Sequence, residues 1–467
     1  MVVPGMEIGI TWFQCIYITS NNIIQLLLGL SEFLLIHIEF SQKCLAETAE
    51  ITDAAFADIA KSDTDAVFIL GDVSNDGETV SHLEFREKLY KLQKSKPVYL
   101  ITATHDWCCD ENPRRFDGDS VYHDVPVMKS RDLPKFYEDF GPKQAISTFI
   151  TKIGTVCFVI ALSEKVRVLC LNDDKNENDH AGFDADCRKW ITEQIDDAKR
   201  CGCTLIGIEH HLLVPHISPL LTGGSTCVEN REEVASFFAD AGLKYMFVGH
   251  SHIQHTDSFT SPAGNKITEV NVGALSGYPA PIVDVLVLDD GRLKYDVRHL
   301  KSFLVNGREV DAESYLARHA TDLIFRITEC RDERQFSERI EALGINPQKL
   351  LPLWGIIKPL LKKVDTALVW DVYKLLKAMH LQGNITRAQA LEYRYKPLRE
   401  MIGEIWLSAL DGSVNIYPRG SAYYNLVSAA VSAPSKIIKS NADLKQLVSA
   451  ADNILTGGRY NNQHDII

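Results

Sequence analysis

Two histidines stand at alternate positions directly after an apolar stretch. Residues 246–252 read Met-Phe-Val-Gly-His-Ser-His, so His250 and His252 follow a glycine. Side chains at positions i and i+2 share one face of an extended segment, so both imidazoles can approach the same ligand. Imidazole nitrogen is a common ligand for zinc and iron in proteins. The spacing is therefore typical of a metal site.

Three further short apolar stretches also end in groups that can do chemistry. In open α/β sheets, ligands bind beyond the carboxyl ends of the strands, where such groups meet. A carboxylate can bridge two cations, and two cations about 4 Å apart can hold a phosphate and activate water. The sequence therefore predicts a metal-dependent site built from four strand ends. The added groups are Gly71-Asp72 after 66–70, Thr104-His105-Asp106 after 97–102, and His210-His211 at the end of 204–211.

These strand ends must be positioned by strands that alternate with helices. Apolar residues recur with helical spacing at 43–61, 79–94 and 184–202. Short apolar runs typical of buried strands lie between these segments, and further strands are predicted within 267–303. The pattern predicts an α/β domain over residues 43–303.

The composition changes on both sides of this domain. Residues 304–467 have mainly helical periodicity, which predicts a mostly α-helical C-terminal domain with a frayed tail at 457–467. Residues 1–42 form an atypical apolar segment in which glutamates are the only charged residues. Polar groups interrupt its apolar part, 8–40, so a buried helix and strand is favoured there, with membrane association as the alternative.

The motif blocks resemble those of the calcineurin-like metallophosphoesterase superfamily. The resemblance covers about residues 43–290 and rests on "LGDVSNDG", "THDW", "EHH" and "VGHSH", in the order that the family has. It implies a β-sandwich flanked by helices and a site for two divalent metal ions, either manganese, iron or zinc. The implied activity is hydrolysis of a phosphomonoester or a phosphodiester.

The resemblance also implies which residues bind the metal ions. Asp72 would bridge both ions. His210, rather than the histidine after it, would bind the second ion together with His250, and His252 would bind the first. Thr104 stands where the family has an asparagine ligand, and its hydroxyl is the weaker ligand.

Other residues would act on the substrate. By its place in the motif, His105 would lie just outside the metal ions and act on the phosphate or the leaving group, with Asp106 orienting it. As an imidazolium, His105 could protonate a departing alkoxide. Arg114 and Arg115, in the loop that follows, are candidates to hold the phosphate.

The first motif of the family, Asp-x-His, has no counterpart in this sequence. Aligned on "LLIHI" at 34–38, the positions that should hold Asp and His hold Phe40 and Gln42. The first metal would then keep only Asp72 and His252, and binding of a single ion is an open alternative. Three interpretations follow: a working enzyme with a rearranged first site, a degenerate binding or scaffold module, or an enzyme impaired at its N-terminus. Because the other blocks are nearly intact, we favour the phosphoesterase.

The charge balance limits the kind of partner. A formal net charge of −13 gives the chain no overall attraction for a long polyanion. We therefore expect a small phosphorylated substrate and not nucleic acid, although a nuclease is the rival activity within the family. Apolar stripes in the helical region fit internal packing or a homo-oligomer interface.

Two expectations concern residues outside these motifs. The 11 cysteines show no zinc-type Cys-x-x-Cys spacing, which indicates free thiols and a cytoplasmic location. Four titratable residues close to the motifs are predicted to be solvated loop groups. They are Asp76, Asp110, His216 and His255.

Overall fold

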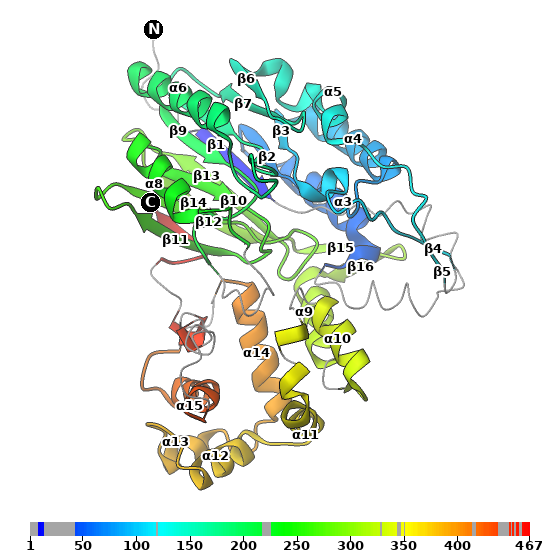
Figure 1. Cartoon of the computed structure of the whole chain (residues 1–467), viewed down its shortest axis with the longest axis vertical. Helices are drawn as coiled ribbons and strands as arrows, with labels where there is room; N and C mark the ends of the chain where they lie inside the picture. Colours follow the sequence, from blue (N-terminus) through cyan, green and yellow to red (C-terminus); the bar gives the residue numbers. More distant parts are fainter. Residues whose placement is uncertain are drawn as a thin grey trace.

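Two β-sheets pack face to face at the centre of the molecule, and helices cover their outer faces (Figure 1). A group of helices lies at one end of this sandwich (Figure 1). The fold is thus the predicted sandwich flanked by helices, followed by a helical region. The structure is a computed structural model that describes residues 8–13, 43–117, 120–216, 226–326, 329–342, 347–349, 351–412, 417–437, 448–449, 451–452, 454–456 and 460–467.

The first sheet has the strand order β17-β14-β13-β1-β2-β3. Its strands β1, β2 and β3 are parallel neighbours, whereas β13, β14 and β17 each pair antiparallel. The strands are β1 (Ile8–Phe13), β2 (Ala66–Leu70), β3 (Val98–Ile101), β13 (Pro281–Val287), β14 (Leu293–His299) and β17 (His464–Ile466).

The second sheet has the strand order β11-β12-β10-β9-β8-β7-β6. Its central strands are parallel and its outer strands are antiparallel. They are β6 (Ser147–Ile150), β7 (Val156–Ala161), β8 (Val166–Cys170), β9 (Thr204–Ile208), β10 (Tyr245–Val248), β11 (His255–Thr260) and β12 (Lys266–Asn271). Two hairpins lie outside both sheets: β4 (Arg115–Asp117) with β5 (Ser120–Tyr122), and β15 (Ser302–Val305) with β16 (Arg308–Asp311).

Side-chain alternation along β2 explains why this strand is apolar throughout. Phe68 and Leu70 point into the core between the two sheets, where they join Phe247 of β10. Val67 and Ile69 point the other way, into the core beneath the helices. A strand buried on both faces has no polar side, and such strands are typical of parallel sheets with helices on the outside.

Helices α3 (Thr48–Ile59) and α4 (Thr79–Gln93) contribute to the core on the outer face of the first sheet, and α6 (Ala185–Cys201) and α8 (Arg231–Ala241) to that of the second. The Asp184 carboxylate begins α6 by accepting a hydrogen bond from the Cys187 N–H at 2.8 Å. Gly202 ends it in the left-handed region, with φ of 66°. Shorter helices here are η1 (Leu45–Glu47), η2 (Thr104–Trp107), η3 (Ser130–Asp132), α5 (Leu133–Phe136), η4 (Glu138–Phe140) and η5 (Pro142–Gln144).

The C-terminal region is helical, as predicted, and most of it has a core of its own. The change from strands to helices takes place at Ala312, because the β15–β16 hairpin extends past residue 304. The helices are α9 (Ala312–Arg326), α10 (Glu333–Ala342), η7 (Pro347–Lys349), η8 (Leu351–Leu353), α11 (Trp354–Val364), α12 (Val369–Ala378), α13 (Arg387–Glu392), α14 (Leu398–Leu410) and α15 (Ala422–Ile437).

The strand beside β2 comes from the N-terminal segment. Within β1, Ile10 to Phe13 pair in parallel with Ala66 to Ile69 of β2. The first sheet therefore includes residues before 43, and its strand beside β2 comes from residues 8–13, whereas the first family motif was aligned on 34–38. That stretch, with Phe40 and Gln42, lies outside the described residues. In the part of the chain that the structure describes, every helix is too short or too polar to cross a membrane.

The predicted frayed tail is instead part of the fold. Asp465 and its neighbours in β17 pair with β14. The side chain of Asn462 is buried and makes two hydrogen bonds. Its Oδ1 accepts from the Thr256 N–H at 2.7 Å, and its Nδ2 donates to the Gly412 carbonyl at 2.7 Å. Two residues after His252, the Gln254 N–H donates to the Leu410 carbonyl at 3.2 Å. The tail and α14 thus hold the segment that follows the paired histidines.

We expect Asn462→Ala to lower the free energy of unfolding by about 2 kcal/mol, because it leaves a buried N–H and a buried carbonyl without partners. Urea unfolding followed by circular dichroism measures this. His464→Ala, at an exposed position in β17, is the matched control and should have little effect. Equal midpoints for the two variants would contradict a supporting role for Asn462.

Candidate metal centre

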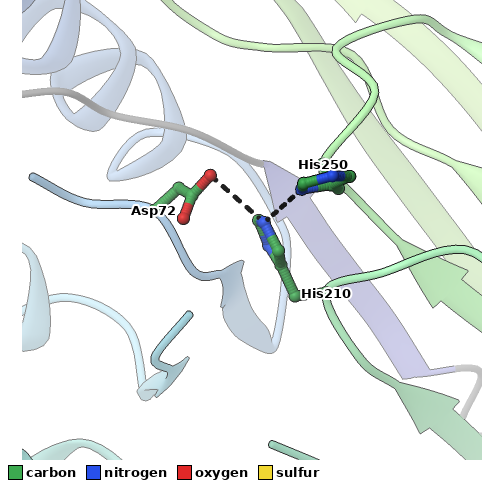
Figure 2. Close-up of side chains that lie close together, drawn as sticks. All are labelled: Asp72, His210 and His250. Atoms are coloured by element: carbon green, nitrogen blue, oxygen red, sulfur yellow. Dashed lines mark hydrogen bonds and ion pairs between the residues drawn. The ribbon is translucent and has the colours of Figure 1, made fainter. Parts of the chain in front are cut away.

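One carboxylate and two imidazoles converge at the ends of strands β2, β9 and β10 (Figure 2). Asp72 Oδ2 lies 3.1 Å from His210 Nε2, which lies 3.3 Å from His250 Nδ1. One ligand atom from each of the three residues lies within 4.8 Å of the others. The strand ends therefore place a possible ligand set around one point.

The backbone at these strand ends is bent into the left-handed region. Asp72, His250 and His252 have φ angles of 55°, 63° and 60°. Such a conformation costs about 1–3 kcal/mol for a residue other than glycine and persists only where the surroundings impose it. Gly71, at φ of 83°, lies against Ala103, and an added Cβ would come within 2.7 Å of the Ala103 Cβ. The site is thus held in a strained turn with no room for a larger residue.

The Asp106 carboxylate supplies that constraint. One oxygen accepts the N–H groups of Val73 and Ser74 at 2.7 and 3.1 Å. The other accepts those of Asp72 and Ala103 at 3.1 and 2.8 Å. Asp106 is fully buried. It binds the backbone of the Asp72 turn, so the prediction that it orients the His105 ring is replaced by a role in positioning Asp72.

The His105 ring is oriented by a backbone carbonyl. Its Nδ1 lies 2.6 Å from the Asn75 carbonyl oxygen, which can only accept, so Nδ1 carries a proton. The His105 N–H donates to Asp72 Oδ1 at 3.3 Å. Burial lowers the pKa of His105 from its usual value. The neutral imidazole, with Nε2 as the nitrogen that exchanges a proton, is the form that this environment favours.

Asp72 and His210 shift each other's pKa in opposite directions. Burial opposes the charge on Asp72, yet His210 and His105 hold the pKa of this carboxyl well below its usual range. Burial also opposes the charge on His210, but Asp72 raises the pKa of the imidazole to about 9. The two side chains form a buried ion pair, with His210 Nε2 3.1 Å from Asp72 Oδ2.

His252 interacts electrostatically with both Asp72 and Lys43. Lys43 is buried, and burial together with its ammonium group lowers the pKa of His252 well below the usual value. Lys43 also lowers the pKa of Asp72 and that of His105. A fixed positive charge therefore lies near the side on which the family holds its first metal ion.

The centre opens onto a cavity of about 820 Å³. His250 and His211 line it at the metal centre. Glu229, Glu232 and Glu233 also line it, with Arg231 among them. The acidic lining disfavours a long polyanion and is suited to a site that recruits cations.

Residues 36–254 match the family model of the calcineurin-like phosphoesterases. Over this region, which is just under half of its 467 residues, the chain is similar to the calcineurin-like phosphoesterases. A comparison with curated proteins gives no match.

Several solved structures resemble the chain in part. A dimetal phosphatase from Danio rerio is 10% identical, with 65% of this chain and 99% of that one covered and a TM-score of 0.44. A purple acid phosphatase from yellow lupin seeds is 13% identical, with coverage of 66% and 53% and a TM-score of 0.41. The NAD nucleotidase of Haemophilus influenzae is 9% identical, with coverage of 78% and 62% and a TM-score of 0.35.

The residues at the centre of the matched region fit a divalent metal ion. His210 Nδ1 donates to the Leu70 carbonyl at 2.8 Å, which fixes the tautomer and leaves Nε2 as the ligand nitrogen. That nitrogen faces the Asp72 carboxylate and His250 Nδ1. A buried carboxylate with two imidazoles is a donor set found for zinc and iron.

Other residues of the predicted site have different surroundings. Thr104 begins the turn η2, next to His105, and its role as a ligand stays a prediction. The Arg114 guanidinium forms two hydrogen bonds with the buried Asp76, at 2.7 and 2.9 Å, so it is already paired. The side chain of Arg115 lies outside the described residues. Binding of a phosphate by either arginine stays a prediction.

The prediction of four solvated loop groups is correct only for Asp110, which is exposed. Asp76 is buried in its ion pair with Arg114. His216 Nδ1 lies 2.8 Å from His255 Nδ1, and its Nε2 lies 2.9 Å from Glu269. Burial lowers the pKa of His216 to about 4 and that of His255 to about 3. These histidines are neutral groups in a buried network.

Sequence reasoning missed Asp173 and Asp174 beside the metal centre, and it set His211 aside as a ligand in favour of His210. Asp173 and Asp174 follow the end of β8, and His211 follows β9; one ligand atom of each lies within 4.8 Å of the others. The signal was present, because Asp173-Asp174 follow an apolar strand just as Asp72 does. Lys43 was missed as well, since no pattern links it to the motifs.

We expect Asp106→Asn to lower the free energy of unfolding by about 3 kcal/mol, since the amide nitrogen cannot accept the N–H groups that one carboxylate oxygen now binds. Urea unfolding measures the change. Asp110→Asn, at an exposed position in the same loop, is the control. A stability equal to that of the control would show that the carboxylate does not hold the Asp72 turn.

His82 supports the same turn and makes its stability depend on pH. Its Nε2 donates to the Asp106 carbonyl at 2.8 Å and its Nδ1 lies 2.7 Å from the Tyr137 hydroxyl. Burial lowers the pKa of His82 to about 4. The unfolded chain takes up this proton at about pH 6.5, so the folded state is stabilised above that pH.

We expect the stabilisation from His82 to be lost as the pH falls from about 6.5 to about 4, by on the order of 3 kcal/mol in total. Urea unfolding of the wild type and of His82→Gln across this window gives the difference in slope. Parallel pH profiles for the two proteins would contradict the prediction.

Proposed function

We propose that this chain hydrolyses a phosphoester with a divalent metal ion bound by Asp72, His210 and His250. The convergence of one buried carboxylate and two imidazole nitrogens, with ligand atoms within 4.8 Å of one another, carries the proposal. The match of residues 36–254 to the calcineurin-like phosphoesterases supports it.

Metal binding and proton transfer are carried out by different residues of the chain. A divalent ion bound at this centre supplies Lewis-acid activation of the phosphate and of water. His210 is kept in the ligand tautomer by the Leu70 carbonyl, and Asp72 is held in its turn by Asp106. His105, with Nδ1 held by Asn75, exchanges a proton through Nε2.

The substrate that we propose is a small phosphorylated molecule. The cavity of about 820 Å³ is within the usual range for small-molecule sites. Its acidic lining, together with the net charge of −13, disfavours a nucleic acid. Both a phosphomonoester and a phosphodiester are compatible with this cavity.

The degenerate module is the second candidate, and one observation favours it. Burial and then the Lys43 ammonium group lower the pKa of His252, the residue that the resemblance assigns to the first metal ion, and Lys43 also contributes to the low pKa of Asp72 after His210 and His105. If the lysine charge takes the place of this ion, the site holds one metal ion instead of two. Such a site is suited to binding a phosphorylated ligand more than to hydrolysing it.

We also propose a reducing compartment such as the cytoplasm. The ten cysteines that the structure describes are all free thiols, and six of them are buried. Burial raises the pKa of Cys170 and of Cys44 well above the usual value, so these thiols are unreactive. Such thiols serve as small apolar core residues.

The test is hydrolysis of bis-p-nitrophenyl phosphate and p-nitrophenyl phosphate by the purified chain with added Mn²⁺. We expect activity that a chelator removes and Mn²⁺ restores. We expect His250→Ala to lose about 100-fold or more, since even residues that only orient metal ligands cost 10–100-fold. His123→Ala, which removes an exposed histidine, should retain the wild-type rate.

The two outcomes separate the candidates. Activity that is lost in His250→Ala and retained in His123→Ala supports the phosphoesterase. A folded wild type without activity on either ester, or a rate that His250→Ala leaves unchanged, would favour the degenerate module.

A further inference from the structure

A second cluster of buried polar side chains lies beside the metal centre and shares no residue with it. Asp173 and Asp174 are almost fully buried at the end of β8, and His211 is buried at the end of β9. The His211 ring centroid lies 4.4 Å from that of His250 and 5.2 Å from that of His210. The cluster is therefore adjacent to the proposed metal ion.

Each carboxylate of the cluster has one oxygen that is held in place. Asp173 Oδ2 accepts the His211 N–H at 2.7 Å. Asp174 Oδ2 accepts the Trp107 indole N–H at 2.9 Å and the Asn172 amide at 3.0 Å. These donors orient the carboxylates in the way that outer-shell groups orient metal ligands.

The remaining polar atoms of the cluster lack hydrogen bonds. Asp173 Oδ1, Asp174 Oδ1 and His211 Nδ1 are buried and have no hydrogen-bond partner within the part of the chain that the structure describes. A buried polar atom without a partner costs about 1–3 kcal/mol, and a charged one costs more. One ligand atom of each of the three residues lies within 4.8 Å of those of the other two, which is close enough for one cation to contact all three.

The geometry within the cluster agrees with that interpretation. His211 Nδ1 and Asp173 Oδ1 lie 3.2 Å apart as an ion pair, and neither atom has a well-aligned hydrogen bond within the described residues. Ligand atoms in a tetrahedral zinc site, with bonds of 2.0–2.2 Å, lie about 3.3 Å apart and point at the metal instead of at each other. The pair is thus spaced as two ligands of one ion.

We propose that Asp173, Asp174 and His211 bind a divalent metal ion, zinc or manganese, next to the ion held by Asp72, His210 and His250. Two carboxylates offset the charge of one divalent ion. Three protein ligands leave a position open for water or substrate. His211 and His250 both line the cavity of about 820 Å³, which gives the two ions a common approach. The chain would then hold a metal pair with His250 and His211 next to each other between the two ions' ligand sets.

The test counts the metal ions that the full-length chain binds. Chain stripped with a chelator is titrated with Zn²⁺ and, separately, Mn²⁺ by calorimetry, and the bound metal is measured by mass spectrometry after gel filtration. The wild type should bind two ions per chain. Asp174→Asn and His211→Gln should each weaken one of them at least tenfold and leave the other unchanged.

Matched variants show which site is occupied. Asp174→Asn preserves the shape of the side chain and an acceptor for Trp107, and circular dichroism confirms folding. Should Asp174→Asn not fold, His211→Gln serves the same purpose. Glu232→Gln removes a carboxylate that lines the cavity outside the cluster and should bind two ions. His250→Ala should lose the other ion and retain the one at Asp173, Asp174 and His211.

The outcomes separate this proposal from the proposed function. A single bound ion that His250→Ala abolishes, with Asp174→Asn and His211→Gln without effect, would overturn the second site and leave the first intact. A single ion that Asp174→Asn abolishes and His250→Ala does not would support the new site and remove the metal centre on which the proposed function rests. No ion bound by the folded wild type would overturn both.

Discussion

The candidate site depends on one buried carboxylate that binds no metal. Asp106 accepts four backbone N–H groups from two strand-end loops, and this ties the turn that carries Asp72 to the turn that carries His105. The left-handed backbone of Asp72 persists because this network over-determines it. Without it, Asp72 would be free to relax, and the alignment of its carboxylate with His210 would be lost.

Charge compensation is the second constraint on this site. Asp72 is paired with His210, and Asp76 with Arg114, so these buried carboxylates have partners within the protein. Among the described residues, Asp173 and Asp174 each have hydrogen-bond donors on one oxygen, and the other oxygen of Asp173 lies 3.2 Å from His211 Nδ1. Because a buried charge without compensation is costly, cations would contribute to the stability of the fold as well as to its chemistry.

Elements of secondary structure that depend on local residue pattern could be predicted from the sequence, whereas pairings between distant segments could not. The apolar run 66–70 and the helical periodicity of 79–94 predicted β2 and α4 to within one residue. Burial on both faces of a strand, or on one face of a helix, requires apolar residues at positions that can be recognised in the sequence. Because polar groups at the carboxyl ends of neighbouring strands meet at one edge of a sheet, the sequence also predicted that Asp72, His210 and His250 lie close together, and they do. The positions of β1 and β17 and the partners of Asp106 and Arg114 were not predictable, since they depend on pairing across tens to hundreds of residues.

The support of the His252 segment by Asn462 has a consequence for synthesis on the ribosome. Thr256 and its partner Asn462 are 206 residues apart. At 5–20 residues per second, on the order of 10–40 s pass between the emergence of one and the other. During that interval the nascent chain exposes the edge of β14 that β17 later covers, and an uncovered strand edge invites pairing with other chains. Chaperone capture in this window would therefore protect the half-built sheet.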